Sequence, residues 1–440
     1  MAVSFRSRLF FLLYRALWRT ASPLLKRSKR LADGWEERHA PQGWLEPEFP
    51  AGEAQDDHAT DIWLQAASGG EARLAVSICR KLDAARPLRV LAVTWTRQGR
   101  DVLEAALPEL AKSHPHLRVA VRFAPFDHPD IARRALEQAR PRLVALLETE
   151  LWPGLMAACR ELGIPICVIN GRITSGTVNA GKRFPSLAAE FAPAAVYAIS
   201  EGDRARFASL FPCPASVMPN IKFDLAAELL ERPLQDAKAV PSPIFLFASV
   251  RDKEEALLPA EFPRIVESRP DARIIVTPRH LHRVEAWKKA LADKGLSPLL
   301  ASENGFSLDV PQDRILIWDR FGDLPQLYAS ASAVFVGGSF GQGGQNFLEA
   351  LAAGLIPCIG PSADNFLWAM ERDAHPSLEE SGLLRTAQTP DEVISIMLEQ
   401  AIAPADKNTV RERFREWLEP RLGASAFAAA LLESQAFPHG

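Results

Sequence analysis

The chain has 440 residues, of which 48% are hydrophobic and 24% charged, and its formal net charge is −3. That length exceeds what one hydrophobic core usually serves, so the sequence predicts two domains. The composition is that of ordinary globular proteins, which excludes disordered, collagen-like and coiled-coil classes, and the slightly acidic balance argues against nucleic acid as the main partner.

The first predicted element, within residues 1–35, is a basic amphipathic helix. Its apolar run Leu9–Tyr14 is followed by Arg15 and is too short for a membrane-spanning helix, which needs about 20 apolar residues. No small-residue cleavage site of a signal peptide follows. We therefore expect the segment to lie on an anionic membrane surface; the alternative is a helix packed on the protein's own surface. The cations that precede the first acid, Asp33, are Arg6, Arg8, Arg15, Arg19, Lys26, Arg27, Lys29 and Arg30.

The cysteines are odd in number, widely spaced and set mostly among apolar residues. This usage is typical of buried thiols in a reducing compartment. Their spacing matches neither a zinc site nor an iron–sulfur site, so no metal is expected. They are Cys79, Cys159, Cys167, Cys213 and Cys358.

Short apolar runs alternate with helical periodicity from Ile62 onward, for example in 71–86 and 152–162. This alternation predicts a parallel sheet with helices on both faces. A proline-rich linker, 233–243, separates a first domain, 36–232, from a second series of strands. The strands predicted before the linker are 62–66, 90–95, 118–123, 142–147, 164–169 and 195–199. Those predicted after it are 244–249, 273–277, 314–318, 333–336 and 356–359.

The second domain is expected to cover 244–405, and the helical residues 406–440 are candidates for crossing back to the first. The predicted fold class is therefore α/β, with two doubly wound Rossmann-like domains facing each other across a cleft. Sheets of this kind bind ligands beyond the carboxyl ends of their strands.

A carboxylate follows the first predicted strand. The sequence there is Ser68, Gly69, Gly70 and Glu71, and helical periodicity begins at Glu71. A Glu at this edge serves as a general base when a substrate hydroxyl comes within hydrogen-bond reach. The alternative is a first-turn Glu that only complements the helix dipole.

Two further acids, Glu148 and Glu150, follow the strand 142–147 and precede Trp152 and Pro153. Proline fits the first turn of a helix. Two carboxylates at such a place are costly without partners, so they are candidates for orienting basic groups or binding substrate hydroxyls. Placement at a helix N-terminus explains at least one of them.

Basic and polar groups follow strands of the second domain. Arg279 offers a planar fork to a phosphate or carboxylate, although a single Arg is usually a surface residue. Ser249 and Arg251 are similar candidate anion contacts, and Lys222 adds a cation before the linker. These groups converge from the second domain while Glu71 comes from the first. That division suits transfer of a group from a nucleotide-activated donor to a hydroxyl acceptor.

A glycine-rich turn follows the strand 333–336. Its glycines permit positive φ and close approach to a ligand, and the N–H groups of a first helical turn point outward. Gln345, Asn346 and Glu349 are expected on that first turn, where a Glu accepts hydrogen bonds from ribose hydroxyls. The prediction is a nucleotide site that holds phosphate and sugar separately; the alternative is a tight turn without a ligand. The turn contains Gly337, Gly338, Ser339, Gly341, Gly343 and Gly344.

Together these motifs resemble the Kdo transferases, the 3-deoxy-D-manno-octulosonic acid transferases of lipopolysaccharide biosynthesis, which have a glycosyltransferase-B fold. The resemblance runs in the same order along the chain to about residue 400, and its most specific element is Glu148–Pro153. The matching stretches are Ser68–Glu71, Glu148–Pro153, Lys222–Asp224, Pro278–His280, Phe335–Ser339, Gly343–Asn346 and Leu348–Ala350.

Membership implies an inverting transfer of Kdo from CMP-Kdo to an acylated lipid A precursor (lipid IVA-like), without metal or cofactor, at the cytoplasmic face of the bacterial inner membrane. By position, Glu71 resembles the general base, and Arg279 and Lys222 resemble groups that stabilise the departing CMP phosphate. The resemblance assigns the donor to Ser249, Arg251, Pro278, Arg279, Gly337, Gly338, Ser339, Gly343, Gly344, Gln345, Asn346 and Glu349, with Glu349 on the ribose. It assigns the acceptor or pocket to Ser68, Gly70, Glu148 and Glu150.

The chain departs from the family pattern at three places. Many relatives have a branched residue at Gly69, a His at Gln345, and a Ser-Thr-His-Glu-Gly-like run at 249–253. The last departure implies either that Arg251 replaces a His contact or that donor preference has shifted. Other functions left open are a glycosyltransferase-B enzyme or epimerase with a different nucleotide sugar, and an inactive membrane-bound nucleotide-sugar sensor. An NAD-dependent dehydrogenase is disfavoured because no Gly-x-Gly-x-x-Gly follows the first strand.

Overall fold

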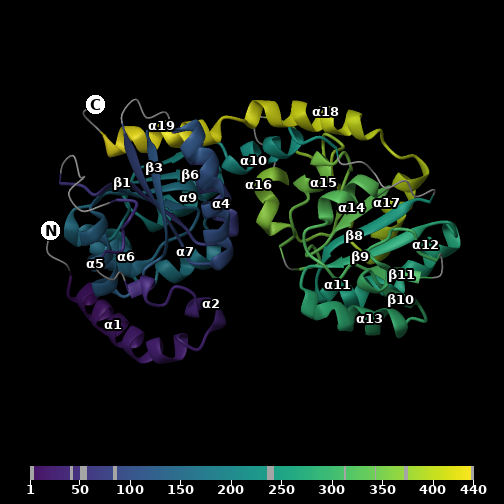
Figure 1. Cartoon of the computed structure of the whole chain (residues 1–440), viewed down its shortest axis with the longest axis horizontal. Coiled ribbons are helices and arrows are strands. Elements are labelled where there is room, and N and C mark those ends of the chain that lie inside the picture. The colour runs from purple at the N-terminus through teal and green to yellow at the C-terminus, as the bar shows by residue number, and fades with distance from the viewer. Residues whose placement is uncertain are drawn as a thin grey trace. The chain divides into compact units, whose positions relative to one another are not determined.

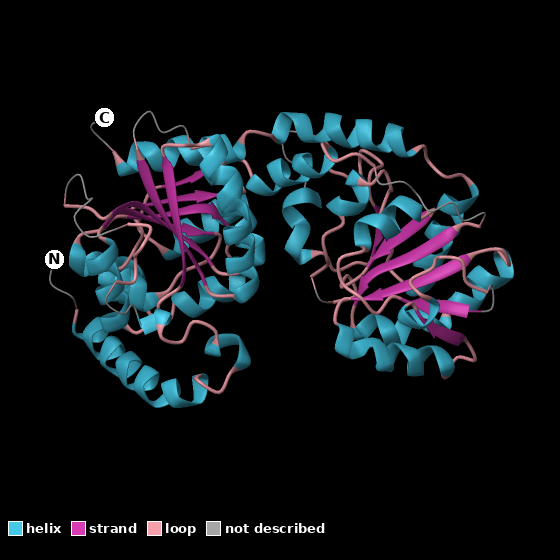
Figure 2. Cartoon of the chain, viewed as in Figure 1, coloured by secondary structure: helices cyan, strands magenta, loops and turns pink. Residues whose placement is uncertain are grey.

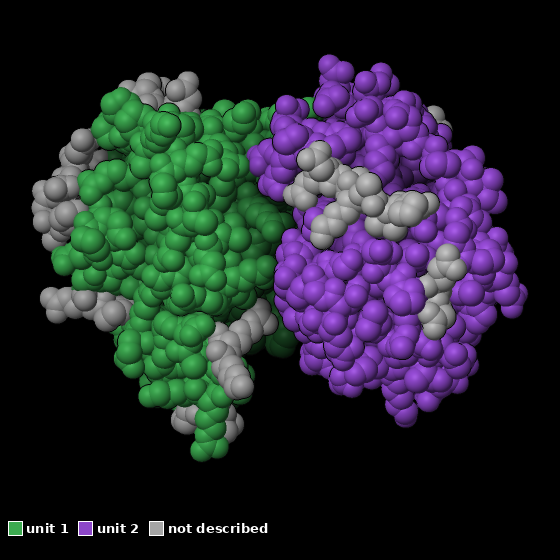
Figure 3. Space-filling view, turned by 45° about the vertical axis from the view of Figure 1, so that its right-hand side comes forward, with its two compact units in different colours: residues 1–225, 421–440 green, residues 226–420 purple. Residues whose placement is uncertain are grey.

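The chain forms two compact units, whose course Figure 1 shows. Unit 1 consists of residues 1–225 together with 421–440, and unit 2 of residues 226–420 (Figure 3). The computed structural model describes residues 4–39, 43–49, 57–82, 87–234, 242–311, 314–341, 343–370 and 375–437. Most of the predicted linker, 233–243, lies outside the described residues.

Unit 1 is built on a parallel sheet (Figure 2). Its strands are β1 (Thr60–Ala66), β2 (Leu88–Thr94), β3 (Leu117–Phe123), β4 (Pro141–Leu147), β5 (Ile166–Gly171), β6 (Ala195–Ala198) and β7 (Ala215–Val217). They are ordered β3-β2-β1-β4-β5-β6-β7, so the direction of winding reverses between β1 and β4. Along β1, Ile62 and Leu64 enter one core and Trp63 another, as expected for a sheet covered on both faces.

Helices cover both faces of this sheet. They are α1 (Phe5–Leu25), α2 (Lys29–Ala32), η1 (Glu37–His39), α3 (Gly69–Cys79), α4 (Arg97–Ser113), α5 (Pro129–Ala139), α6 (Pro153–Leu162), α7 (Ser175–Gly181), α8 (Pro185–Glu190), α9 (Glu201–Leu210), α10 (Ile221–Leu230), which continues into unit 2, and α19 (Ala424–Ala436). One core joins the sheet to α3, α4 and α19, and the other joins it to α5 and α6. The last helix of the chain therefore completes the core of the first unit.

Helix α1 packs on unit 1 through one face. On that face, the ring of Phe11 lies 5.1 Å from that of Phe191, and the ring of Trp18 lies 5.8 Å from that of Phe126. The opposite face exposes apolar side chains by 45% to 80%: Phe5, Leu9, Leu12, Leu13 and Leu17. Packing on the protein's own surface is thus confirmed for one face, and membrane contact of the other stays a prediction. No helix in the described part of the chain is both long and apolar enough to cross a membrane.

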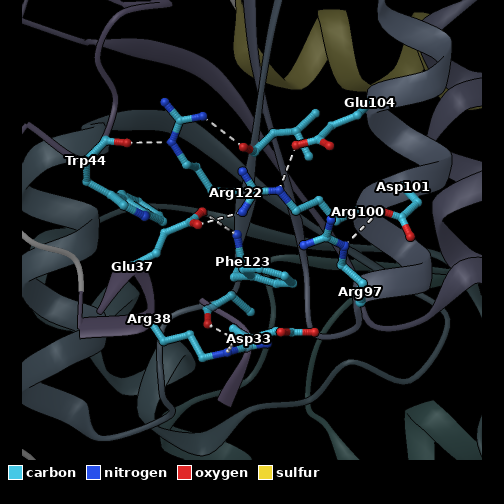
Figure 4. A network of polar contacts seen from close by, with 12 residues as sticks. Asp33, Glu37, Arg38, Trp44, Arg97, Arg100, Asp101, Glu104, Arg122 and Phe123 are labelled. Atoms are coloured by element: carbon cyan, nitrogen blue, oxygen red, sulfur yellow. Dashed lines mark hydrogen bonds and ion pairs between the residues drawn. The ribbon is translucent and has the colours of Figure 1, made fainter. Parts of the chain in front are cut away.

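The segment after α1 runs along β3, the terminal strand of the sheet (Figure 4). Glu37 accepts a hydrogen bond from the N–H of Phe123 at 2.7 Å and binds Arg100 Nη1 at 2.6 Å. Arg122 donates to the carbonyl oxygen of Trp44 at 2.5 Å. These contacts cover an edge whose backbone groups would otherwise be open to pairing with another chain, and they hold residues 33–39 and 43–49 against unit 1.

Unit 2 has a second parallel sheet, ordered β10-β11-β9-β8-β12-β13-β14 (Figure 1). Its strands are β8 (Ile244–Val250), β9 (Arg273–Pro278), β10 (Ser297–Leu300), β11 (Arg314–Ile317), β12 (Ala333–Val336), β13 (Cys358–Ile359) and β14 (Arg385–Thr386). Its main helices are α11 (Asp252–Leu257), α12 (Phe262–Ser268), α13 (Val284–Ala292), α14 (Leu324–Ser330), α15 (Leu348–Ala352), α16 (Leu367–Met370), α17 (Pro390–Ile402) and α18 (Lys407–Leu418). Phe245, Phe247 and Phe335 lie at the centre of its core and are fully buried.

The two parallel-sheet α/β units confirm the predicted fold class. The predicted strands coincide with observed ones within a few residues, whereas the short strands β7, β10 and β14 have no predicted counterpart. The helix after β1 begins at Gly69 rather than Glu71 and ends at Cys79. The last part of its predicted range, 83–86, lies outside the described residues.

Candidate active site

Two loops at the carboxyl edge of the unit 1 sheet bring three carboxylates together. Glu71 lies on the first turn of α3, after β1, and Glu148 and Glu150 lie between β4 and α6. Strands β1 and β4 are hydrogen-bonded neighbours, and the charges of Glu71 and Glu148 both raise the pKa of Glu150. The three acids therefore stand at the point where the strand order reverses, which is where open α/β sheets bind ligands.

Glu71 forms a capping box with Ser68 at the start of α3. Its Oε2 accepts hydrogen bonds from the Ser68 N–H, at 2.7 Å, and from the Ser68 hydroxyl. The helix-terminal role foreseen as the alternative is therefore present. Among the described residues, Oε1 has no hydrogen-bond partner, and the neighbouring Gly70 is exposed. Oε2 is thus fixed by Ser68, while Oε1 remains able to accept a hydrogen bond from a substrate hydroxyl.

The departure from the family pattern at Gly69 has a local explanation. A Cβ built at this position would lie 2.9 Å from Cγ and Cδ of Gln98, on the first turn of α4. The Gln98 side chain therefore occupies the space that a branched residue at 69 would need.

Glu148 has the basic partner that two neighbouring acids require. Lys222 Nζ lies 2.5 Å from its Oε1, and both side chains are at least three-quarters buried. Glu148 adopts a φ of +56°, in the left-handed region, and its N–H donates to the carbonyl oxygen of Ile169 at 3.0 Å. The ion pair places Lys222, a predicted phosphate contact, against a carboxylate of unit 1.

Glu150 is held by tryptophan side chains. Trp152 Nε1 donates to its Oε2 at 2.6 Å, and the Trp152 ring lies 4.6 Å from the ring of Trp95, which follows β2. Burial raises the pKa of Glu150 to about 7, the charges of the two nearby acids add to the rise, and the bond from Trp152 opposes it. Glu150 consequently changes its protonation state near neutral pH, an arrangement common at functional sites.

In unit 2, the glycine-rich turn folds around an internal carboxylate. Glu254 accepts hydrogen bonds from the N–H groups of Gly338 at 2.8 Å, Ser339 at 2.9 Å and Arg251 at 2.8 Å. It is 1% exposed, and burial raises its pKa, which these N–H groups lower. The N–H groups at 338 and 339 therefore do not point at a ligand. In the later part of the turn, the N–H groups of Gly344 and Gln345 donate to the carbonyl oxygens of Gly338 at 2.8 Å and Gly337 at 3.1 Å. Binding of a nucleotide phosphate by this turn stays a prediction.

The turn needs its glycines for two reasons. A Cβ at Gly337 would lie 2.6 Å from the Cα of Val250, so the two backbones approach too closely for any side chain. Gly338, Gly343 and Gly344 adopt φ values of +71°, +78° and +80°, which side chains disfavour.

Helix α15 begins later than predicted. Its first residue is Leu348, whose N–H donates to Asn346 Oδ1 at 3.2 Å, while Asn346 Nδ2 donates to Glu349 Oε1 at 3.1 Å. The prediction that Gln345 and Asn346 lie on the first helical turn is wrong, because Asn346 satisfies the helix terminus from outside. Glu349 does lie on the first turn, half-buried.

Basic groups gather at the carboxyl ends of β8 and β9. Pro278 is the last residue of β9, directly before Arg279, and Ser249 near the end of β8 has a φ of +54°. The pKa of His280 is lowered by partial burial and by the charges of Arg251 and Arg279. The charges of two guanidinium groups thus act on the same imidazole, and such a local concentration of positive charge suits the binding of a phosphate or carboxylate.

Two residues with central places in these sites, Trp95 and Glu254, are absent from the predicted set. Trp95 is the last residue of the predicted strand 90–95, and Glu254 follows the predicted strand 244–249 by a few residues, so only their positions near the carboxyl ends of strands could have pointed to them. In the part of the chain that the structure describes, no group of His, Cys, Asp and Glu side chains is arranged to hold a metal ion.

Known proteins match this chain in sequence and in fold. Residues 33–225 match the family model of 3-deoxy-D-manno-octulosonic-acid transferase (kdotransferase). The chain is 31% identical over 385 residues to the 3-deoxy-D-manno-octulosonic acid transferase of Bordetella pertussis. The aligned region covers 85% of this chain and 87% of the relative.

Solved structures extend the comparison to both units. A glycosyltransferase from Rickettsia africae has a TM-score of 0.54 at 11% identity and covers 86% of this chain and 99% of its own. A UDP-GlcNAc 2-epimerase from Neisseria meningitidis has a TM-score of 0.52 at 13% identity and covers 86% of this chain and 100% of its own. At such low identity, these likenesses show the fold alone.

Proposed function

This chain belongs to the 3-deoxy-D-manno-octulosonic acid (Kdo) transferase family and is a Kdo glycosyltransferase, and we propose that it transfers Kdo from CMP-Kdo to a hydroxyl of a lipid A precursor. The observation that carries the proposal is the carboxylate group at the switch point of unit 1. There Glu71 has one oxygen fixed by Ser68 and one able to receive a proton. The basic groups of unit 2 supply the complementary chemistry for a nucleotide phosphate.

In the proposed reaction, Glu71 takes the proton of the acceptor hydroxyl as the hydroxyl oxygen attacks the anomeric carbon of Kdo. The bond between that carbon and the phosphate oxygen breaks, and CMP leaves with the electron pair. Attack from the face opposite the leaving group inverts the anomeric configuration. Glu148 and Glu150 are proposed to hold acceptor hydroxyls in the geometry of attack.

The departing phosphate gains charge in this step, so cations near it lower the barrier. We assign this role to Arg279, together with Arg251, whose charge acts on the same imidazole, that of His280. Lys222 would exchange its ion pair with Glu148 for the phosphate. On the nucleotide, Glu349 is proposed to accept hydrogen bonds from the ribose.

The exposed face of α1 is proposed to lie on the cytoplasmic surface of the inner membrane, where an acylated acceptor would be held. Its leucines are flanked by the exposed Arg6, Arg8 and Arg19, a combination that suits anionic lipid. A second exposed segment adjoins it. Phe184 is 51% exposed, follows two exposed cations, and its ring lies 5.5 Å from that of Phe10 on α1.

The function is tested by incubating the protein with CMP-Kdo and a tetraacylated disaccharide and measuring the mass of the lipid. Addition of Kdo is the expected result. Glu71→Gln should slow transfer at least about a hundredfold, because general-base catalysis contributes that much, while CMP binding stays within about twofold. Glu161→Gln, on an exposed position of α6, is the matched control. Near-normal turnover by Glu71→Gln would remove it as the base.

The donor is tested separately by nucleotide protection in thermal melting. Cytidine nucleotides should raise the melting temperature more than uridine nucleotides at equal concentration, since a ligand that binds the folded state stabilises it. Protection by uridine nucleotides alone would favour a different nucleotide sugar, and protection without any Kdo product would favour an inactive sensor.

A further inference from the structure

One buried carboxylate joins the N-terminal helix to the loop that carries Glu150. Asp127 follows β3 and is 2% exposed. Its Oδ2 accepts a hydrogen bond from the hydroxyl of Tyr14, on α1, at 2.7 Å. The same carboxylate accepts the N–H of Gly154 at 3.0 Å and of Leu155 at 2.8 Å. These are amides of the first turn of α6, directly after the Glu150 loop.

The connection is close-packed on both sides. On the side of α1, the Trp18 ring lies 5.8 Å from Phe126, whose N–H donates to the carbonyl oxygen of Arg38 at 2.9 Å. On the side of α6, a Cβ at Gly154 would lie 2.3 Å from the carbonyl oxygen of Asp127. Neither α1 nor α6 can shift against this segment without losing a contact or creating a clash.

Asp127 depends on its hydrogen-bond donors because it is almost fully buried, at 2% exposure. Burial raises its pKa to about 6, while the bonds from Tyr14, Gly154 and Leu155 oppose the rise. Loss of the Tyr14 hydroxyl would leave the buried carboxylate with one hydrogen-bond donor fewer. The ionised form of Asp127 would then be less stable, and its hydrogen bonds with the N–H groups of Gly154 and Leu155 would be weaker.

Movement of α6 would reach the candidate site directly. Trp152 is the residue that precedes α6, and its carbonyl oxygen accepts the N–H of Met156 at 2.9 Å. The Trp152 side chain in turn donates to Glu150 at 2.6 Å, and its ring packs against the ring of Trp95 at 4.6 Å. The orientation of Glu150 therefore follows the position of the first turn of α6.

We propose that Tyr14 and Asp127 are positioning residues of the transferase, through which the docked helix α1 fixes the first turn of α6 and so the placement of Glu150. The inference rests on the proposed role of Glu150 in holding the acceptor. All its contacts lie within unit 1, so the positioning operates whether or not a membrane is present.

The test compares Tyr14→Phe, which removes one hydroxyl and keeps the ring, with Asp130→Asn. The control breaks another contact of α1, the ion pair between Arg15 and Asp130 at 3.2 Å, which does not reach α6. Both are made in the full chain and measured for kcat, for the KM of CMP-Kdo and of the tetraacylated disaccharide, and for amide hydrogen exchange.

Tyr14→Phe should lower kcat about five- to tenfold, leave both KM values within about twofold, and speed exchange at Gly154 and Leu155 about tenfold. Asp130→Asn should leave kcat and these two exchange rates within about twofold. Gly154→Ala displaces α6 from the other side and should reproduce the loss of kcat without altering α1.

Unchanged kcat in Tyr14→Phe would overturn the proposal, even if exchange at Gly154 rose, because the hydroxyl would then serve structure alone. An equal loss in Asp130→Asn would also overturn it, since any loosening of α1 would suffice. If the wild-type protein does not turn over CMP-Kdo, the proposed donor has failed instead. The exchange comparison then still decides whether Tyr14 holds α6.

Discussion

At the scale of single residues, Glu150 shows how a fold tunes one carboxyl group. The side chain is shielded from water, lies near two other acids and has one donor, Trp152. Its pKa of about 7 in the folded chain compares with 4.5 for an unperturbed Glu. The folded state therefore holds the proton more tightly than the unfolded state, and ionisation of this group at higher pH costs stability.

Glu150→Gln should stabilise the protein in a pH-dependent way. The contribution of Glu150 to stability is full below about pH 4.5 and is lost as pH rises through about 7. At pH 8 the free energy of unfolding of the variant should therefore exceed that of the wild-type protein by about 1–3 kcal/mol, which raises the melting temperature by a few degrees. Near pH 5 the two proteins should differ little. Thermal melting at both pH values measures this, with Glu161→Gln as the control. Equal gains at the two pH values would contradict the assigned pKa.

How far the sequence predicts the site depends on whether the signal is local. The positions of Glu71 and Glu148 at the edge of the sheet can be predicted, because each follows an apolar strand within a few residues and parallel strands end at one edge. Asp127 also follows a strand, but its role comes from Tyr14, 113 positions earlier. Glu254 likewise meets Gly338 84 positions later. Contacts of that separation leave no periodicity to detect.

At the scale of elements, the glycine-rich turn keeps its shape through Glu254. Three backbone N–H groups converge on this carboxylate, so the turn is ordered by an anion of the protein itself. The N–H of Gly344 is also used inside the turn, where it donates to the carbonyl oxygen of Gly338 at 2.8 Å, and nucleotide binding by the turn stays a prediction. The sequence predicted the turn from its glycines but not its organising acid, which lies on α11.

Glu254→Gln should loosen this turn. Gln keeps one acceptor oxygen and replaces the other with an NH2 group, so it cannot accept all the hydrogen bonds that the Glu254 carboxylate accepts. The variant should therefore lose about 1–3 kcal/mol of stability. It should also bind CMP about tenfold more weakly. Calorimetric titration with CMP and thermal melting measure the two effects. Glu255→Gln is the matched control, because Glu255 pairs with Arg283 and does not touch the turn. Unaltered CMP affinity in Glu254→Gln would show that the turn holds without the carboxylate.

Helix α1 has two faces, and each has its own test. The inner face is examined through Tyr14, and the outer face through Leu12 and Leu13, which are 64% and 62% exposed. Replacing both leucines with Glu removes apolar area and adds negative charge, so binding to anionic vesicles should weaken at least about tenfold, with no change in melting temperature. Vesicle co-sedimentation measures this. The control is Ile402→Glu on α17, at a residue that is 72% exposed. If the double leucine variant still bound the vesicles, the membrane contact would lie elsewhere.

The strands missed by the sequence prediction, β7, β10 and β14, are all edge strands. In β7 and β10 no residue is buried, and β14 has two half-buried residues. Such strands carry few apolar side chains because they pack on the core along one side only. Central strands such as β4, buried along almost their whole length, give the continuous apolar runs that the sequence reveals.

At the scale of the whole molecule, the chain is not two consecutive domains. It builds most of unit 1, then unit 2, and its last twenty residues, 421–440, return to unit 1. The return is fixed by Asp224, whose carboxylate accepts the N–H of Gly423 at 2.8 Å and of Ser425 at 2.6 Å, capping α19. The Ser425 hydroxyl also meets that of Ser77, on α3, at 2.8 Å. Unit 1 is therefore incomplete without α19.

Removing residues 421–440 should unfold or loosen unit 1 and spare unit 2. Helix α19 packs on α3, β1 and β4, so its loss exposes an apolar face of the sheet. A milder variant, Leu432→Ala, truncates a side chain that is 1% exposed and should cost about 2–4 kcal/mol, whereas Leu422→Ala, at a residue 41% exposed, should cost less than about 0.5 kcal/mol.

Hydrogen exchange resolves where this loss falls. Amides of α3, β1 and β4 should exchange faster in Leu432→Ala, because α19 packs on these elements, and amides of β8 and β9, in unit 2, should not. If exchange rose equally in both units, the two would unfold as one cooperative body. If it rose in neither, α19 would be an appendage, and the core that it shares with α3 would contribute little to the stability of unit 1.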